Sequence, residues 1–268
     1  MAKPLLPDEL WSLIEPHLPI ERPVPYGRKP LANRKALTGI VFVLKTGIPW
    51  EYLPQEMGCG CGMTCWRRLR DWQQAGVWDR ILHVLQNNLG QQGLIDWSRA
   101  ALDSASVRAK GGGRLTGRNP TDRGKLGSKH HIIVDRNGIP LAKPTLTPAN
   151  DHDSIHFERV LDSVRPIRQQ RGRPRRRPAK LHADKAYDHR RCRRACRRRG
   201  IMARIARRGI ESRTRLGRFR WVVERTISWL HNFRRLATRY ERRDDIHAAL
   251  LTLGTIMICW NFLRQSIC

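Results

Sequence analysis

The fold is decided by four short stretches in the middle of the chain, the first of which is RAALDSASV at residues 99–107. The others are KHHIIVDRNGIPLAKPTLTP (129–148), AKLHADKAY (179–187) and GIMARIAR (200–207). All four are rich in β-forming residues, and Asp135-Arg136-Asn137-Gly138 supplies a hairpin turn within the second. Helical stretches at 152–164 and 188–199 alternate with the later strands. This order predicts a mixed α/β sheet flanked by helices.

Outside this centre the apolar residues recur at helical spacing. The predicted N-terminal helices are LWSLIEPHL (10–18), NRKALTGIVFVLKTG (33–47) and TCWRRLRDWQQAGVWDRILHVLQNNL (64–89). The segment 217–265 is again helical, first basic and amphipathic, then nearly apolar. We therefore expect an N-terminal helical region at 1–95 and an α/β region with C-terminal helices at 96–268.

The charge balance points to a polyanionic partner. The 268 residues include 52 Lys and Arg against 23 Asp and Glu, a formal net charge of +29. Such a chain attracts polyanions, and nucleic acid is the commonest of these inside cells. A secreted cationic protein or a ribosomal component would show the same balance. The charge thus favours nucleic-acid binding without indicating any chemistry.

Three further features favour a cytoplasmic protein with no membrane segment. The N-terminus lacks the apolar stretch and cleavage site of a signal peptide. The most apolar run, 248–262, is interrupted by Thr, Gly and Asn and is short for a membrane span, so we expect a buried helix. Seven scattered cysteines are not typical of a disulfide framework.

The segment 64–89 predicts a helix-turn-helix-like arrangement. Thr64 can cap a first helix, and Gly76 separates it from a second. Arg67, Arg68 and Arg70 point away from the apolar face of the first helix. Such a face is often merely solvated, but under this net charge we favour contact with DNA.

Two arginine-rich runs bracket one aspartate in the sequence. They are RQQRGRPRRRPAK (168–180) and HRRCRRACRRR (189–199), on either side of Asp184. A solvated loop or helix face would have the same composition. Because a phosphate backbone would need to lie near Asp184, we favour binding.

Three acids occupy unusual places for such a basic chain. Asp103 follows the apolar run RAAL, Asp184 follows KLHA, and Glu224 lies on a helix flanked by apolar residues. A carboxylate in such a place is costly unless a cation satisfies it. Pairing with arginines is one solution. Convergence on Mg²⁺, which prefers carboxylate oxygens, is the other, and the residues alone leave both open.

The blocks around these acids resemble a known family. LDSASVRAKGGG (102–113), HADKAYD (182–188) and RWVVERTISWLHNFRRLATRYER (220–242) resemble those of bacterial insertion-sequence DDE transposases, in the branch named after insertion sequence five. TPANDHDS (147–154) and GIPWEYLP (47–54) are also similar to segments of that family. The resemblance runs over most of the chain, and the third block is the most specific.

The resemblance implies an RNase H-like catalytic domain. Asp103 would lie on the first strand, Asp184 just after the fourth and Glu224 on a later helix, all three as ligands of Mg²⁺ or Mn²⁺. The wider superfamily carries Tyr-x2-Arg-x3-Glu-x6-Lys around the glutamate. Arg220 and Glu224 match it, whereas Gly217 replaces the Tyr and His231 the Lys.

The implied activity is cleavage at insertion-sequence ends and strand transfer into target DNA. The partners would be the terminal inverted repeats and target DNA, bound by a homodimer or larger assembly at the bacterial nucleoid. The DNA-binding candidates in the block around Glu224 are Arg220, His231, Arg234 and Arg235. The alternatives are a non-catalytic repressor derived from a transposase, and a nuclease that cuts without joining.

The cysteines supply a competing, weaker hypothesis of a zinc site. Cys59, Cys61 and Cys65 would combine with the distant His83, but their spacing does not match a common zinc motif. Cys192 and Cys196 are expected to be packing residues on a helix. His130 and His131 should point to opposite faces of a strand, so they cannot share one ion.

Overall fold

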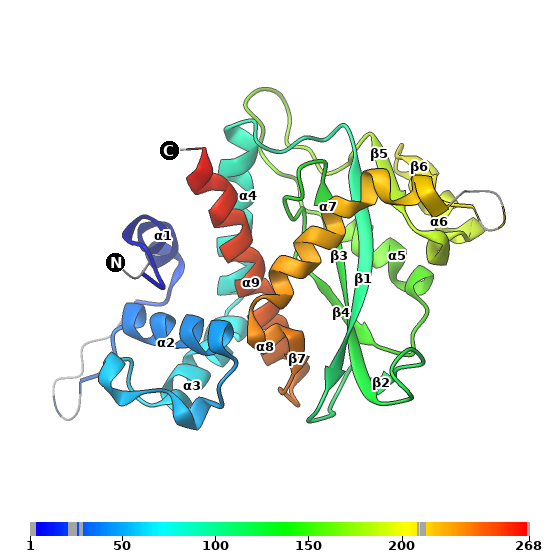
Figure 1. The fold of residues 1–268 in the computed structure, drawn as a ribbon. Helices are drawn as coiled ribbons and strands as arrows, with labels where there is room; N and C mark the ends of the chain where they lie inside the picture. The colour runs from blue at the N-terminus through cyan, green and yellow to red at the C-terminus, as the bar shows by residue number, and fades with distance from the viewer. Residues whose placement is uncertain (1–3, 21–25, 27–28, 208, 210–212, 267–268) are drawn as a thin grey trace.

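The computed structural model describes residues 4–20, 26, 29–207, 209 and 213–266 (Figure 1). The helices are α1 (Asp8–Ile14), α2 (Asn33–Thr46), α3 (Gly62–Gln74), α4 (Val77–Gln91), α5 (Asp153–Asp162), α6 (Arg190–Arg198), α7 (Arg213–His231), α8 (Arg234–Ala237) and α9 (Asp244–Gln265). The strands are β1 (Ala100–Ala109), β2 (Gly117–Arg118), β3 (Leu126–Asp135), β4 (Thr145–Pro148), β5 (Lys180–Ala183), β6 (Met202–Ile205) and β7 (Thr238–Arg239). Short 3₁₀ turns are η1 (Glu15–His17), η2 (Trp50–Tyr52), η3 (Gln55–Met57) and η4 (Lys185–Tyr187).

The strands form one mixed sheet, as the sequence pattern predicted. Its order is β2-β3-β1-β5-β6, with β4 paired to β3 and β7 to β1. β1 is antiparallel to β3 and parallel to β5, which is in turn parallel to β6. The turn after Asp135 is also confirmed, because its carboxylate accepts the backbone N–H groups of Asn137 and Ile139 at 2.9 and 2.7 Å. Gly138 supplies the left-handed residue of that turn, with φ of 92°.

Two predicted strand boundaries were wrong. The stretch 179–187 is not one strand, because β5 ends at Ala183 and η4 follows. Asp184 causes the change, since its Oδ1 accepts the backbone N–H of Ala186 at 2.9 Å and caps the turn. In contrast, the first strand extends beyond the predicted residue 107 to Ala109. Asp103 lies within β1.

Helices cover both faces of the sheet. α7 crosses one face diagonally in front of β1, and α5 and α6 lie on the other side (Figure 1). The two adjacent histidines of β3 mark these faces. His130 contacts His247 of α9, with 2.9 Å between their Nε2 atoms, whereas His131 contacts Thr147 and lies beside His156 of α5. The prediction that they point to opposite faces is confirmed.

The N-terminal helices join the sheet domain through α9. α4 and α9 run side by side (Figure 1), and buried residues from Leu6 to Leu263 form one continuous apolar core. α9 is long and apolar enough to cross a membrane by length and composition, with a mean hydropathy of 1.7, but 83% of that window is buried inside the protein. The prediction of a buried helix over 248–262 is confirmed.

α3 and α4 are two helices separated by Ala75 and Gly76, as expected from the sequence. Burial limits how this pair can bind DNA. The apolar face of α4, from Val77 to Leu89, is buried, and the helix packs on α9. The outward face of α3 remains open and carries the exposed Arg67. A helix-turn-helix in which the second helix enters a groove is thus not evident here.

Candidate active site

The sheet topology brings the two aspartates together. In the parallel pair of β1 and β5, Ala101 is level with His182. Two residues further along the chain in each case, Asp103 within β1 and Asp184 directly after β5 therefore lie beside one another. Asp103 shares its face of β1 with the small residues Ala101 and Ala105, because side chains alternate along a strand. These small side chains leave room for α7 to approach β1.

α7 adds the third acid and an arginine one helical turn before it. Arg220 Nη2 lies 3.6 Å from Asp103 Oδ2 and 3.2 Å from Glu224 Oε1. The Glu224 side chain is 54% exposed although apolar residues flank it in the sequence. The guanidinium thus bridges a strand acid and a helix acid. Arginine pairing, one of the two explanations that the residues left open, is therefore present for Asp103 and Glu224.

Asp103 has the most perturbed environment of the three acids. Its pKa is raised from 3.8 to about 6, chiefly by burial, and the charges of Asp184 and Glu224 act in the same direction. Arg220 and the backbone N–H of Ser104, which donates to Oδ1 at 2.8 Å, act in the opposite direction. Mutual repulsion among the acids means that they lie close enough to sense one another. A cation added here would be stabilised by all three.

Tyr187 packs beneath the acids. Its ring is fully buried, with its centroid 5.6 Å from that of Phe157. Burial raises the pKa of its phenol well above the usual value, and the charges of Asp153, Asp103 and Asp184 act in the same direction. The phenol is therefore neutral.

The donor set of the site suits a hard divalent cation, since carboxylate oxygens are what Mg²⁺ and Mn²⁺ prefer. Within the described residues, however, no three histidine, cysteine or acidic side chains are arranged to hold a metal ion as they stand. Arg220 explains the difference, because its guanidinium lies between Asp103 and Glu224.

Arg225 anchors α7 and was not predicted from the sequence. Its guanidinium lies 4.6 Å from the ring centroid of Trp221 and 4.5 Å from that of Trp229. It also donates to the carbonyl of Asn137 at 2.5 Å. This holds α7 on the turn after β3 and so positions Glu224. The sequence pattern that could have identified it is the spacing of Trp221, Arg225 and Trp229. Residues four apart lie on one face of a helix.

The predicted DNA-contacting residues of α3 differ in availability. Arg67 is exposed. Arg68 donates to the carbonyl of Leu31 at 3.2 Å, and Arg70 pairs with Asp71 at 2.7 Å. Only Arg67 of the three therefore carries an uncommitted guanidinium towards solvent.

The DNA-binding candidates that follow Glu224 in the sequence also differ in their exposure. Arg234 is exposed, whereas Arg235 is only 6% exposed and forms an ion pair with Glu241 at 2.7 Å. Arg235 also donates to the carbonyl of Ile48 at 3.0 Å, so it connects α8 to the N-terminal helices. The buried Arg235 is not positioned to contact DNA. Burial lowers the pKa of His231, which favours its neutral form.

The described cysteines are free thiols. Cys59 and Cys65 are buried, and burial raises the pKa of Cys65 to about 12. Cys192 and Cys196 are buried on α6, which confirms their packing role. Cys268 lies outside the described residues.

Two known families match the chain. Residues 6–82 match the family described as "Putative transposase of IS4/5 family", and residues 96–262 match the family described as "Transposase DDE domain". From Burkholderia cepacia, the "Putative transposase for insertion sequence element IS402" is 54% identical over 151 residues, which cover 56% of this chain and 71% of that protein. The "Insertion element IS402 uncharacterized 16.2 kDa protein" of the same organism is 59% identical over 123 residues, covering 45% and 84% respectively.

The mixed sheet, with one aspartate within β1, one directly after β5 and a glutamate on the helix above them, has the RNase H-like fold that the DDE domain implies. The chain belongs to the DDE transposases of insertion sequences. It is therefore a DNA transposase, an enzyme of a class that uses divalent metal ions. The resemblance noted in the sequence is confirmed, and a purely repressive role is not favoured.

Proposed function

We propose that Asp103, Asp184 and Glu224 are the catalytic metal ligands of this transposase, with Mg²⁺ or Mn²⁺ as the cofactor. The observation that carries the proposal is the placement of these acids on β1, directly after β5 and on α7, with Arg220 between Asp103 and Glu224. Divalent ions bound there supply positive charge that activates the attacking water or 3′-hydroxyl and stabilises the leaving oxygen.

Arg220 and two backbone N–H groups control the charge of the site and the orientation of its carboxylates. Arg220 neutralises the acids in the absence of metal and, when displaced, has a phosphate oxygen as its natural new partner. The backbone N–H of Ser104 fixes one oxygen of Asp103, and the N–H of Ala186 fixes one of Asp184. The second oxygen of Asp103 faces Arg220, so it would become available as a ligand when the guanidinium is displaced.

The DNA contacts outside the acids are assigned to exposed arginines of two regions. We place Arg67 of α3 and Arg234 of α8 against the phosphate backbone, because both are exposed and uncommitted. His231, whose ring lies 6.0 Å from that of the buried His130, would act as a neutral hydrogen-bonding group rather than as a phosphate-binding cation. The helical region 1–95 would thus hold the terminal inverted repeats, with 96–268 as the catalytic domain. Its packing on α9 makes it a rigid extension rather than a tethered module.

We further propose that the protein works as a homodimer or larger assembly on DNA, in the bacterial cytoplasm at the nucleoid. Two element ends must be held together for joining to one target, and one acidic centre serves one end at a time. The high positive charge favours residence on DNA.

The test is strand transfer of a pre-cleaved element end into plasmid DNA in Mg²⁺. Wild type is compared with Asp184→Asn and with Asp122→Asn, a matched change in the loop after β2. We expect wild type and Asp122→Asn to join the end, and Asp184→Asn to bind DNA equally but join nothing. Activity of Asp184→Asn would refute the assignment of ligands. Wild type that binds without reacting would support the repressor, and one that cuts but never joins would support the nuclease.

A further inference from the structure

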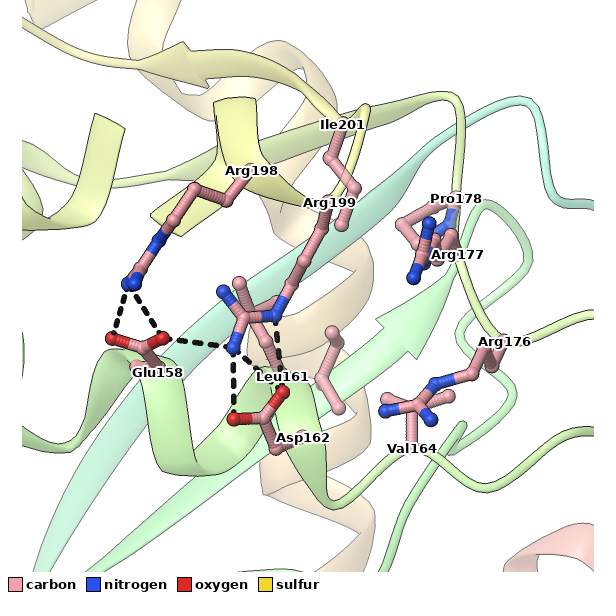
Figure 2. Close-up of a pocket in the computed structure, with 11 residues that line it drawn as sticks. Glu158, Leu161, Asp162, Val164, Arg176, Arg177, Pro178, Arg198, Arg199 and Ile201 are labelled. Atoms are coloured by element: carbon pink, nitrogen blue, oxygen red, sulfur yellow. Dashed lines mark hydrogen bonds and ion pairs between the residues drawn. The ribbon is translucent and has the colours of Figure 1, made fainter. Parts of the chain in front are cut away.

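A second charged cavity lies between α5, α6 and the loop before β5. It has a volume of about 300 Å³ and an apolar floor that includes Ile133, Leu161 and Ile201. Its walls carry four arginines and two acids (Figure 2). The arginines come from both arginine-rich runs that the sequence singled out, so the fold brings these runs together at one place.

One wall of the cavity is internally neutralised. Arg198 donates to both oxygens of Glu158, at 2.7 and 2.9 Å. Arg199 donates to both oxygens of Asp162, at 2.7 and 2.8 Å, and to Glu158 at 2.9 Å. These pairs clamp α6 to α5. They leave no net charge on this wall, since two arginines meet two carboxylates.

The opposite wall is not neutralised. Arg176 and Arg177 are exposed, and neither donates a hydrogen bond nor forms an ion pair with any part of the chain that the structure describes. Figure 2 shows both guanidinium groups directed into the cavity, facing the clamped pairs. The cavity therefore holds two uncompensated positive charges, each with several N–H donors free. Such an arrangement selects an anion with several acceptor oxygens.

This cavity is separate from the acidic centre. Its floor residue Ile133 is paired with Leu102, whereas the next pair along the strands, Ile132 and Asp103, points to the other face of the sheet. It also lies at the start of β5, and Asp184 follows the end of that strand, roughly 13 Å further on at ~3.3 Å per residue. The arginine runs thus bracket Asp184 in sequence but converge on the opposite face, which corrects the expectation that they line the acidic site.

We propose that this cavity binds backbone phosphates of a DNA duplex at a second position, remote from the acids. Arg176 and Arg177 supply the contacts, and the clamped pairs of α5 and α6 form the rigid wall opposite them. Phosphate oxygens accept two parallel N–H bonds from a guanidinium, and such contacts position DNA without reading its sequence. A transposase must hold DNA beyond the bond that it cuts, and a site on the far face would hold flanking or target DNA.

The test compares two double variants from the same loop. Arg176→Ala/Arg177→Ala removes the unpaired charges of the cavity, and Arg171→Ala/Arg173→Ala removes an equal charge outside it. Binding of a 40-base-pair duplex is measured by fluorescence anisotropy over a range of KCl concentrations. Removing two phosphate contacts should lower the slope of log K against log[salt] by about 1.8, at ~0.9 per contact. The control pair should change it clearly less, with the same melting temperature in both variants.

Equal losses in the two pairs would overturn the proposal, because they would indicate only a diffuse basic loop. An unchanged slope in the cavity variant would overturn it as well. A second arm measures the thermal shift of each protein with inorganic phosphate. If the cavity variant loses stabilisation by free phosphate but binds DNA normally, the site takes a small anion and the assignment to DNA is wrong.

Discussion

Replacing Asp103 with asparagine should stabilise the metal-free protein at neutral pH, although it removes a catalytic carboxylate. The Asp103 side chain is only 16% exposed. Burial raises its pKa from 3.8 to about 6, and Arg220 at 3.6 Å compensates only in part. The folded protein therefore disfavours the charged form of this group. Asparagine has nearly the same shape and no charge to desolvate.

The magnitude follows from the difference between the two pKa values, about 2.2 units. At about 1.36 kcal/mol per unit, the ionised carboxylate costs about 3 kcal/mol of folding free energy. Because the folded pKa lies above the unfolded one, this cost is absent below pH ~4, grows between pH ~4 and ~6, and is constant above that. The stabilising effect of the variant should follow the same course.

The assay is urea unfolding in EDTA at pH 4, 5, 6, 7 and 8, with Asp122→Asn as the control that changes one carboxylate elsewhere. We expect Asp103→Asn to be more stable than wild type by up to about 3 kcal/mol at pH 7 and nearly equal to it at pH 4. Excess Mn²⁺ should reverse the order, because only wild type gains binding energy from the ion. A variant less stable than wild type at pH 7 in EDTA would refute the reasoning, as would a difference that persists at pH 4.

Two further predictions concern the arginines of the C-terminal helices. Arg220→Ala should bind Mn²⁺ several-fold more tightly by calorimetry, because no guanidinium then competes with the ion, while Arg220→Lys should stay close to wild type; weaker binding by the alanine variant would contradict the bridging role. Arg235→Ala should cost about 3–5 kcal/mol in urea unfolding, because it removes the arginine partner of the buried Glu241 and leaves it only His247, at 3.7 Å. Adding Glu241→Gln to Arg235→Ala should recover part of that loss, and a further loss instead would show that the buried charge is not its cause.

Much of the fold could be predicted from local pattern. The strands around Asp103 and His130, the turn at Gly138 and the amphipathic helices each depend on residues close in sequence. Turn residues and hydrophobic periods act over a few positions, so they are readable without knowing the rest of the chain. The three acids were identified on the correct elements for the same reason, with the help of the family blocks.

The burial and the ion pairing of each acid could not be predicted from local sequence. Asp103 follows an apolar run and apolar residues flank Glu224, yet the side chain of the first is only 16% exposed and that of the second 54%. Burial depends on which element packs over a side chain, and here that is the approach of α7 to β1. The bridge from Arg220 to Asp103 spans elements more than a hundred residues apart, so it exists only in the folded chain.

The arginines show the same division. By itself, the sequence determined that the protein is strongly basic, that it forms a mixed sheet between helices, and that three acids stand in transposase-like blocks. Only the tertiary structure decided that Arg235 is buried against Glu241 and that Arg198 and Arg199 are clamped. It also decided that Arg176 and Arg177 have no ion-pair partner among the residues that the structure describes. The physical reason is that a guanidinium forms an ion pair only with acceptors that long-range packing brings within a few ångströms. The composition gives the number of charges but not which of them lie close together.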